Sequence, residues 1–145
     1  MSCESKDDLA DFHVRIAVEA LAPHRDPLIL GNLSHTALLL CRVKFERTPA
    51  FDGDWKWLAE PERVKSRAAV QEDFHPACER RRVDPAAPWP KKLRIRNVEG
   101  APGIWEMTWS FSGPDGRATF EWVEIDGQPG IRWRRIGGHA IFGDP

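Results

Sequence analysis

Five side chains in the C-terminal part of the chain could together perform acid–base chemistry on a phosphodiester. Cleavage of RNA without a metal needs a base for the 2′-hydroxyl, an acid for the leaving oxygen and positive charge at the phosphorane. Glu106 offers the base, and His139, whose imidazole titrates near neutral pH, offers the acid. Arg117 and Arg135 would hold phosphate oxygens through paired N–H donors. Phe142 would stack on a nucleobase, so we expect all five residues to be catalytic.

Ordinary structural roles compete with these assignments. Glu106 and Arg117 could form a cross-strand ion pair, which contributes little free energy at a surface. His139 could cap a turn, and Phe142 could close one end of the core. The residue types alone leave these alternatives open.

Three strands joined by tight turns must position these side chains. Along residues 104–111 apolar and polar side chains alternate, which is typical of a strand with one buried face. The alternation resumes over 117–125 and again from 131, after turn sequences at 113–116 and 126–130. Strands with short connections pair antiparallel, so we expect a meander with an aromatic face and a polar face.

The preceding residues predict a strand, two helices and a further strand. Residues 41–47 alternate as a strand, and Thr48 followed by proline is a helix start that leads to a helix ending near residue 59. A second helix begins at residue 60 and is kinked or ended by Pro76. Its expected apolar side is formed by Val64, Ala68, Val70 and Phe74. Residues 91–98 alternate as a strand with Leu93 and Ile95 inward.

These elements predict an α+β fold. We expect two N-terminal helices packed on one face of a four- to five-stranded twisted antiparallel sheet. The opposite face would carry basic side chains for binding RNA, namely Lys91, Lys92, Arg94, Arg96, Arg132 and Arg134. Strict alternation puts Arg135 on the aromatic side, unless a bulge at residues 137–138 re-aims the chain. An arginine-rich sheet face is often only a solvated surface, and that alternative stays open.

Composition limits the classes of function. The chain has 145 residues and a net charge of −1, without the basic excess of a general nucleic-acid binder. It contains no apolar run of about 18 residues and no basic leader, so we expect neither a membrane span nor a secretory signal. Three widely spaced cysteines favour a reducing, cytoplasmic location over disulfides or zinc. Nothing in the sequence predicts a metal or another cofactor.

Four features of residues 42–145 resemble the RelE/ParE superfamily of small bacterial toxins. The first is the order strand, helix, helix and β-meander. The second is the basic strand at 93–96, shortly before a Gly-x-x-Gly turn. The third is the carboxylate in IWEM at 104–107, followed after a turn by GRATF at 116–120. The fourth is the ending RIGGHAIF at 135–142, while residues 1–41 match nothing in the family and are expected to be an N-terminal extension.

The resemblance implies a toxin of a type II toxin–antitoxin system. In the RelE branch such proteins cleave mRNA in the ribosomal A site without a metal, and most are neutralised by a cognate antitoxin. By resemblance, Arg117, Arg135, His139 and Phe142 match functional positions of that branch, and Glu106 falls on a strand position used in parts of the family. This chain departs from the pattern because Phe142 lacks a hydroxyl and follows His139 by three residues, where several relatives use four.

The leading prediction is therefore a ribosome-dependent mRNA endoribonuclease that inhibits translation, with mRNA, the ribosome and an antitoxin as partners. One alternative is a ParE-like protein that inhibits DNA gyrase without nuclease chemistry. Another is a non-catalytic domain whose arginine face binds an acidic partner.

Overall fold

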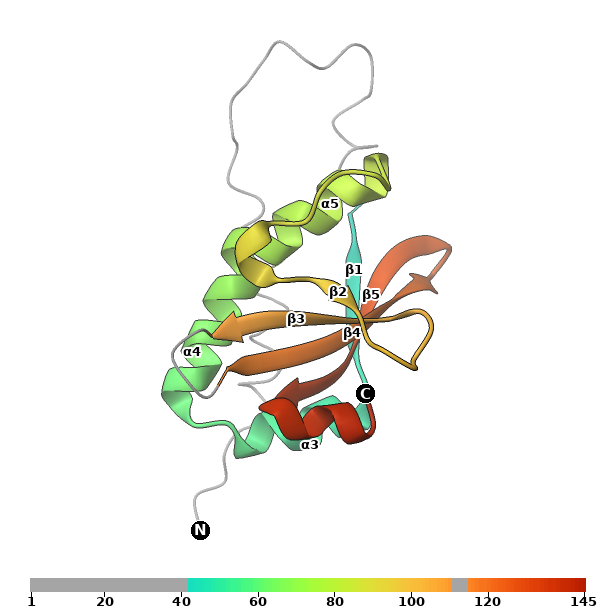
Figure 1. The fold of residues 1–145 in the computed structure, drawn as a ribbon. Coiled ribbons are helices and arrows are strands. Elements are labelled where there is room, and N and C mark those ends of the chain that lie inside the picture. The colour runs from blue at the N-terminus through green and yellow to red at the C-terminus, as the bar shows by residue number, and fades with distance from the viewer. Residues whose placement is uncertain (1–41, 111–114) are drawn as a thin grey trace. The chain divides into compact units, whose positions relative to one another are not determined.

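The computed structural model describes residues 42–110 and 115–145 (Figure 1). The chain divides into two units between Arg42 and Val43, and the second, Val43–Pro145, carries the elements described below. The predicted extension at residues 1–41, the last residue of the strand predicted over 104–111 and the first half of the turn predicted at 113–116 lie outside the described residues. Within these residues, no helix is long and apolar enough to cross a membrane.

Five strands form one mixed sheet. They are β1 (Lys44–Arg47), β2 (Arg96–Asn97), β3 (Ile104–Ser110), β4 (Gly116–Ile125) and β5 (Gln128–Gly137), in the spatial order β1-β5-β4-β3-β2. The predicted antiparallel meander of β3, β4 and β5 is confirmed. The prediction of a wholly antiparallel sheet is wrong, because β1 pairs parallel to β5. The helical segment after β1 brings the chain to the opposite edge of the sheet, where β2 lies. The meander then leads back across the sheet, and its last strand, β5, lies beside β1 and runs in the same direction (Figure 1).

The first described helix, α3 (Pro49–Trp57), begins where the Thr-Pro signal predicts. The Thr48 hydroxyl accepts a hydrogen bond from the amide of Phe51 at 3.2 Å and donates one to the main-chain carbonyl of Arg134 at 2.7 Å. One side chain thus caps the helix and ties its start to β5. The amide of Thr48 also donates to the carbonyl of Trp133, which continues the β1–β5 pairing up to the helix.

The helical layer is dominated by one long helix rather than by two separate ones. It runs through α4 (Glu60–Ala69), a π-helical turn (Val70–Phe74) and α5 (His75–Val83). Pro76 was predicted to kink or end the helix, and it does not end it, because the helix continues for seven more residues. In a regular α-helix the proline ring would clash with the carbonyl four residues earlier, and the wider π-turn before it relieves that clash.

The apolar stripe predicted for this helix is partly wrong. Val64 is exposed, whereas Arg63 and Ser66 are buried. The guanidinium of Arg63 donates to the carbonyls of Trp55 at 3.2 Å and Lys56 at 3.1 Å. Those carbonyls lie in the last turn of α3, where helical partners run out, although the Trp55 carbonyl also accepts from the amide of the C-cap residue Leu58 at 3.2 Å. Burial of Arg63 therefore caps α3, which an apolar side chain could not do.

The strand predicted over residues 91–98 is mostly not a strand. Lys91–Leu93 forms a 3-10 turn, Arg94 adopts the left-handed conformation with φ of 46°, and only Arg96–Asn97 pairs with β3. The turn buries Leu93, as predicted, and lets Lys92 reach Asp73 at 2.7 Å. The hydrogen bond from Lys92 to that carboxylate raises the pKa of the lysine.

An aromatic core fills the space between the helices and the sheet. Phe74 from the π-turn lies 4.8 Å, centroid to centroid, from both Phe120 of β4 and Trp133 of β5. Phe51 and Trp55 of α3 complete this core, and all five side chains are buried. The predicted aromatic face of the meander is thus confirmed.

The opposite face of the sheet is also buried, which the alternation did not predict. Glu106, Thr108 and Thr119 are each no more than 3% exposed. A C-terminal 3-10 helix, η3 (His139–Gly143), packs against β4 and β5, and its Ile141 is buried. The cross-strand register aligns Arg96, Glu106, Thr119 and Arg135 in one row across this face.

Candidate functional site

A groove of about 310 Å³ lies on the polar side of the sheet, between the β2–β3 edge and η3. It is lined by Arg96, Asn97, Val98, Glu99, Glu106, His139 and Phe142. Three of the five residues predicted to be catalytic line it, together with one arginine predicted to bind RNA. They come from three separate elements, β2, β3 and η3, so the fold brings them together.

Glu106 is the most buried of these groups. Its side chain is 4% exposed and accepts a hydrogen bond at Oε1 from Nε of Arg96, whose side chain is 72% exposed. The two residues are directly opposite in the β2–β3 ladder. The ion pair therefore joins a buried carboxylate to an arginine whose side chain is mostly exposed. Arg96, and not the Arg117 that the sequence suggested, is the cross-strand partner of Glu106.

His139 and Phe142 lie next to each other on η3. Their ring centroids are 5.1 Å apart with planes at 76°, an edge-to-face contact. Side chains three residues apart lie above one another in a 3-10 helix. The three-residue spacing of His139 and Phe142 therefore brings their rings together in this element. His139 is exposed and Phe142 half-buried, while the intervening Ile141 is buried against the sheet.

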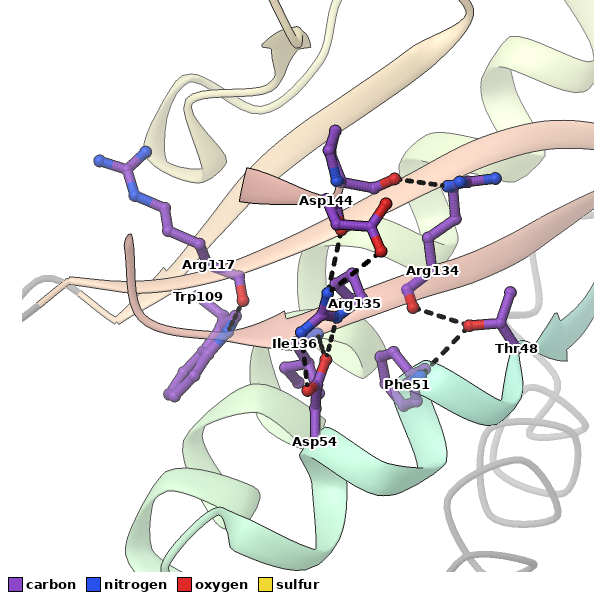
Figure 2. Close-up of polar contacts among 10 residues, drawn as sticks. Thr48, Phe51, Asp54, Trp109, Arg117, Arg134, Arg135, Ile136 and Asp144 are labelled. Carbon is purple, nitrogen blue, oxygen red and sulfur yellow. Dashed lines mark hydrogen bonds and ion pairs between the residues drawn. The ribbon is translucent and has the colours of Figure 1, made fainter. Parts of the chain in front are cut away.

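Arg117 does not line the groove. Its Nη1 donates to the Thr108 hydroxyl at 2.7 Å and its Nη2 pairs with Asp115 at 3.2 Å. Figure 2 shows its guanidinium pointing away from Arg135. The structure therefore uses Arg117 to satisfy a buried hydroxyl on β3, and it does not bring the two predicted phosphate-binding arginines together.

Arg135 also lies outside the groove. Its Nε and Nη2 donate to the two carboxylate oxygens of Asp54 at 2.7 and 3.1 Å (Figure 2). The hydrogen bond to Asp54 raises the pKa of this guanidinium. The predicted bulge exists, but it is centred on Arg134 and not on residues 137–138. Trp133 pairs with Phe120 and Arg135 with Thr119, which leaves Arg134 as the extra residue.

Five of the six basic residues predicted to bind RNA lie outside the groove. Arg132 binds Glu46 and Glu121, and Arg134 binds Glu121 and the main-chain oxygen of Pro145. Lys91, Lys92 and Arg94 are exposed in and directly after the 3-10 turn at Lys91–Leu93, and they do not line the groove. Arg96 is the member of this set that the structure brings to the site.

Three further groove residues, Asn97, Val98 and Glu99, carry no sequence signal that predicted them as part of a site. They lead into the turn at residues 100–103, where Gly100 and Gly103 have φ of 78° and 81°. The Gly-x-x-Gly pattern signals the turn, but only the fold places it opposite η3. Glu99 adds a second carboxylate, so the groove has a formal charge of −1 with His139 neutral and none with His139 protonated. Protonation of His139 therefore favours an anionic ligand.

Comparison of the chain with protein-family models, with curated proteins and with solved structures gives no match. The family resemblance of the sequence therefore stays a prediction. Among residues 42–110 and 115–145, no group of three or more histidine, cysteine or acidic side chains could hold a metal ion.

Proposed function

We propose that residues 42–145 are a RelE/ParE-like toxin domain that cleaves mRNA on the ribosome and thereby inhibits translation. One observation carries the proposal: Glu106, His139, Phe142 and Arg96 line a single groove although they lie up to 46 residues apart. A base, an acid, an aromatic platform and a guanidinium are the groups that metal-independent RNA cleavage requires. The order of strand, helical segment and meander is in keeping with the same proposal.

The roles follow from exposure and pairing. Glu106, fixed by Arg96, takes the proton from the 2′-hydroxyl as its oxygen attacks phosphorus. The bond from phosphorus to the 5′-oxygen breaks, and His139 donates a proton to that leaving oxygen, which yields a cyclic phosphate and a 5′-hydroxyl. Arg96 holds the phosphate through its solvent-facing donors. Phe142 stacks on a base and draws the strand out of its helical form. Arg96 thus takes the role that the sequence assigned to Arg117 and Arg135.

Cell-free translation tests the proposal. Wild-type protein is expected to arrest translation and to leave cut mRNA with cyclic phosphate ends, while His139→Ala and Glu106→Gln are expected to reduce the cleavage rate at least about 100-fold. Arg132→Ala is the matched control for Arg96→Ala, because Arg132 is also a strand arginine paired with glutamates, but it lies outside the groove. If His139→Ala arrests translation as wild type does, the proposed acid is wrong.

A second candidate is a ParE-like inhibitor of gyrase or another binding domain without nuclease chemistry. The observation that favours it is the engagement of Arg117 and Arg135 in internal contacts, which leaves one arginine in the groove. That candidate predicts DNA damage signalling and intact mRNA on expression of the protein. Co-expression with a short neighbouring gene would test for an antitoxin under either candidate.

A further inference from the structure

Two consecutive arginines at the end of β5 hold the residues that follow η3. Nη1 of Arg135 donates to the main-chain carbonyl of Asp144 at 3.0 Å. Nε of Arg134 donates to the main-chain oxygen of Pro145, also at 3.0 Å, and its Nη1 binds Glu121 at 3.1 Å. Figure 2 shows both guanidiniums directed at this short segment. The bulge at Arg134 allows this, because in a regular strand neighbouring side chains point to opposite faces.

Asp54 fixes Arg135 from the other side. Besides its two bonds to the guanidinium, Oδ2 of Asp54 accepts from the amide of Ile136 at 3.2 Å. This amide lies beyond the part of β5 that β1 covers, since the ladder between those strands ends at Trp133. A carboxylate of α3 thus replaces the missing strand and orients Arg135 in a bidentate geometry.

The contacts tether η3 at both ends. Asp54 binds the Ile136 amide before it, and Arg135 binds the Asp144 carbonyl after it. In the middle, Ile141 packs against Gly137, where an added Cβ would lie 3.2 Å from Cγ2 of Ile141. Two main-chain hydrogen bonds at the ends of the segment carrying His139 and Phe142 are long: the Ile141 amide donates to the Gly138 carbonyl and the Asp144 amide to the Ile141 carbonyl, both at 3.4 Å. We therefore expect the tethers to contribute to the position of η3.

We propose that Asp54 and Arg135 are positioning residues that fix η3 and so place His139 and Phe142 beside Glu106. The catalytic part of this inference rests on the proposed function. Arg135 acts through η3 and does not bind the phosphate of the substrate. The guanidinium is charged throughout the physiological pH range, as arginine always is, and its pairing with Asp54 raises its pKa further.

Amide hydrogen exchange tests the tether without any assay of activity. In Asp54→Ala and in Arg135→Ala, the Ile141 and Asp144 amides are expected to exchange at least about tenfold faster, while amides in the centre of β4 do not change. The double variant is expected to show less than the combined effect of the two single variants, because both changes break the same Asp54–Arg135 pair. Arg132→Ala, which breaks ion pairs of the same strand away from η3, is the control and should leave both amides unchanged. Unchanged exchange in Arg135→Ala would overturn the proposal.

Cleavage kinetics separate positioning from direct phosphate binding. If Arg135 positions η3, Asp54→Ala and Arg135→Ala lower kcat by similar factors, roughly tenfold or more, and Asp54→Asn and Arg135→Lys recover part of the loss. If Arg135→Ala abolishes cleavage while Asp54→Ala leaves it intact, Arg135 acts on the substrate and the inference is wrong. If the thermal midpoints of Asp54→Ala and Arg135→Ala are close to that of Arg132→Ala, general unfolding is excluded as the cause of the loss. If Asp54→Ala does not fold, Asp54→Asn takes its place. Wild-type protein without nuclease activity would refute the proposed function, but the exchange experiment would still decide the tether.

Discussion

The two faces of the sheet are both buried, but by different chemistry. On the helical face, large rings such as Phe120 and Trp133 pack against the long helix and are at most 1% exposed. On the face under η3, Glu106, Thr108 and Thr119 are equally inaccessible. The first face is stabilised by removal of apolar area from water. The second must satisfy each polar atom with a specific partner, because an unpaired buried group costs free energy.

The difference between the two faces explains where a site can form in this fold. Apolar packing of rings on the helical face is non-directional, whereas hydrogen bonds and ion pairs on the polar face fix the directions of three arginines. Arg117 binds Thr108, Arg96 binds Glu106 and Arg135 binds Asp54. Partners with fixed directions orient reactive groups, and the groove opens on this face.

The largest effect is expected on the helical face. Trp133→Ala removes a ring that contacts Phe51, Phe74 and Phe120, and it should lower the free energy of unfolding by about 3–5 kcal/mol. Trp57→Ala, at a residue that is 90% exposed, is the control and should stay within about 0.5 kcal/mol of wild type in urea unfolding. If Trp133→Ala lowers the free energy of unfolding by less than about 1 kcal/mol, the helical face is not stabilised chiefly by its buried rings.

A smaller effect is expected at the buried ion pair of the polar face. Glu106→Ala deletes a side chain that is 4% exposed and should cost about 1–3 kcal/mol, part of it through the space left behind. Glu46→Ala removes the partner of Arg132 from a pair that is about 40% exposed, and it should cost at most about 1 kcal/mol. Urea unfolding measures both variants. Equal losses of unfolding free energy would show that the burial of Glu106 does not increase its contribution to stability.

Replacement by valine should change the stability of the fold in opposite directions at two threonines of the polar face. Thr108→Val leaves Arg117 without a buried acceptor and should cost about 1–2 kcal/mol. The Thr119 hydroxyl has no hydrogen-bond partner among the described residues, so Thr119→Val should be neutral or stabilise by up to about 1 kcal/mol. Thermal unfolding of the two isosteric variants checks the difference. A clear destabilisation by Thr119→Val would reveal a partner for that hydroxyl.

The smallest effect concerns a carboxylate on the helical side, Glu79 of α5. Burial acts most strongly and opposes its ionisation, but hydrogen bonds from His75, the Val43 amide and Arg82 together lower its pKa from the ordinary value of 4.5. A lowered folded-state pKa means that ionised Glu79 stabilises the fold above about pH 4.5. This stabilisation is lost as the pH falls through the folded-state pKa.

Glu79→Gln should therefore be less stable than wild type at pH 7, by about 1 kcal/mol, and this difference should shrink in acid. Glu124→Gln, at an exposed residue of β4, is the control. Urea unfolding between neutral and acidic pH measures both variants. A difference for Glu79→Gln that does not depend on pH would contradict the role of its charge.

Sequence patterns found the elements that local physics determines. The alternation over β3 and β4 and the Thr48 cap were predicted, because side-chain direction and capping depend on neighbouring residues. The alternation of residues 91–98 predicted a strand that is mostly a turn, since the same pattern also fits a turn that buries Leu93. The burial of Arg63 was missed, because its partners are carbonyls at the end of another helix.

The site was predicted in part. Residue types named Glu106, His139 and Phe142, and the structure brings all three to one groove. They could not show that Asp54, 81 residues away, binds Arg135, or that Thr108 and Asp115 bind Arg117. Whether an arginine faces a ligand or an internal partner depends on which carboxylates the fold brings within reach.

The sequence by itself determined the meander, its aromatic face, the start of α3 and the chemical groups available for a site. These depend on periodicity and on neighbours along the chain. Only the tertiary structure decided that the polar face is buried, that β1 runs parallel to β5 and that Arg96 is the arginine at the groove. The physical reason is that burial and ion pairing depend on distances between segments far apart in the chain, which no local pattern encodes.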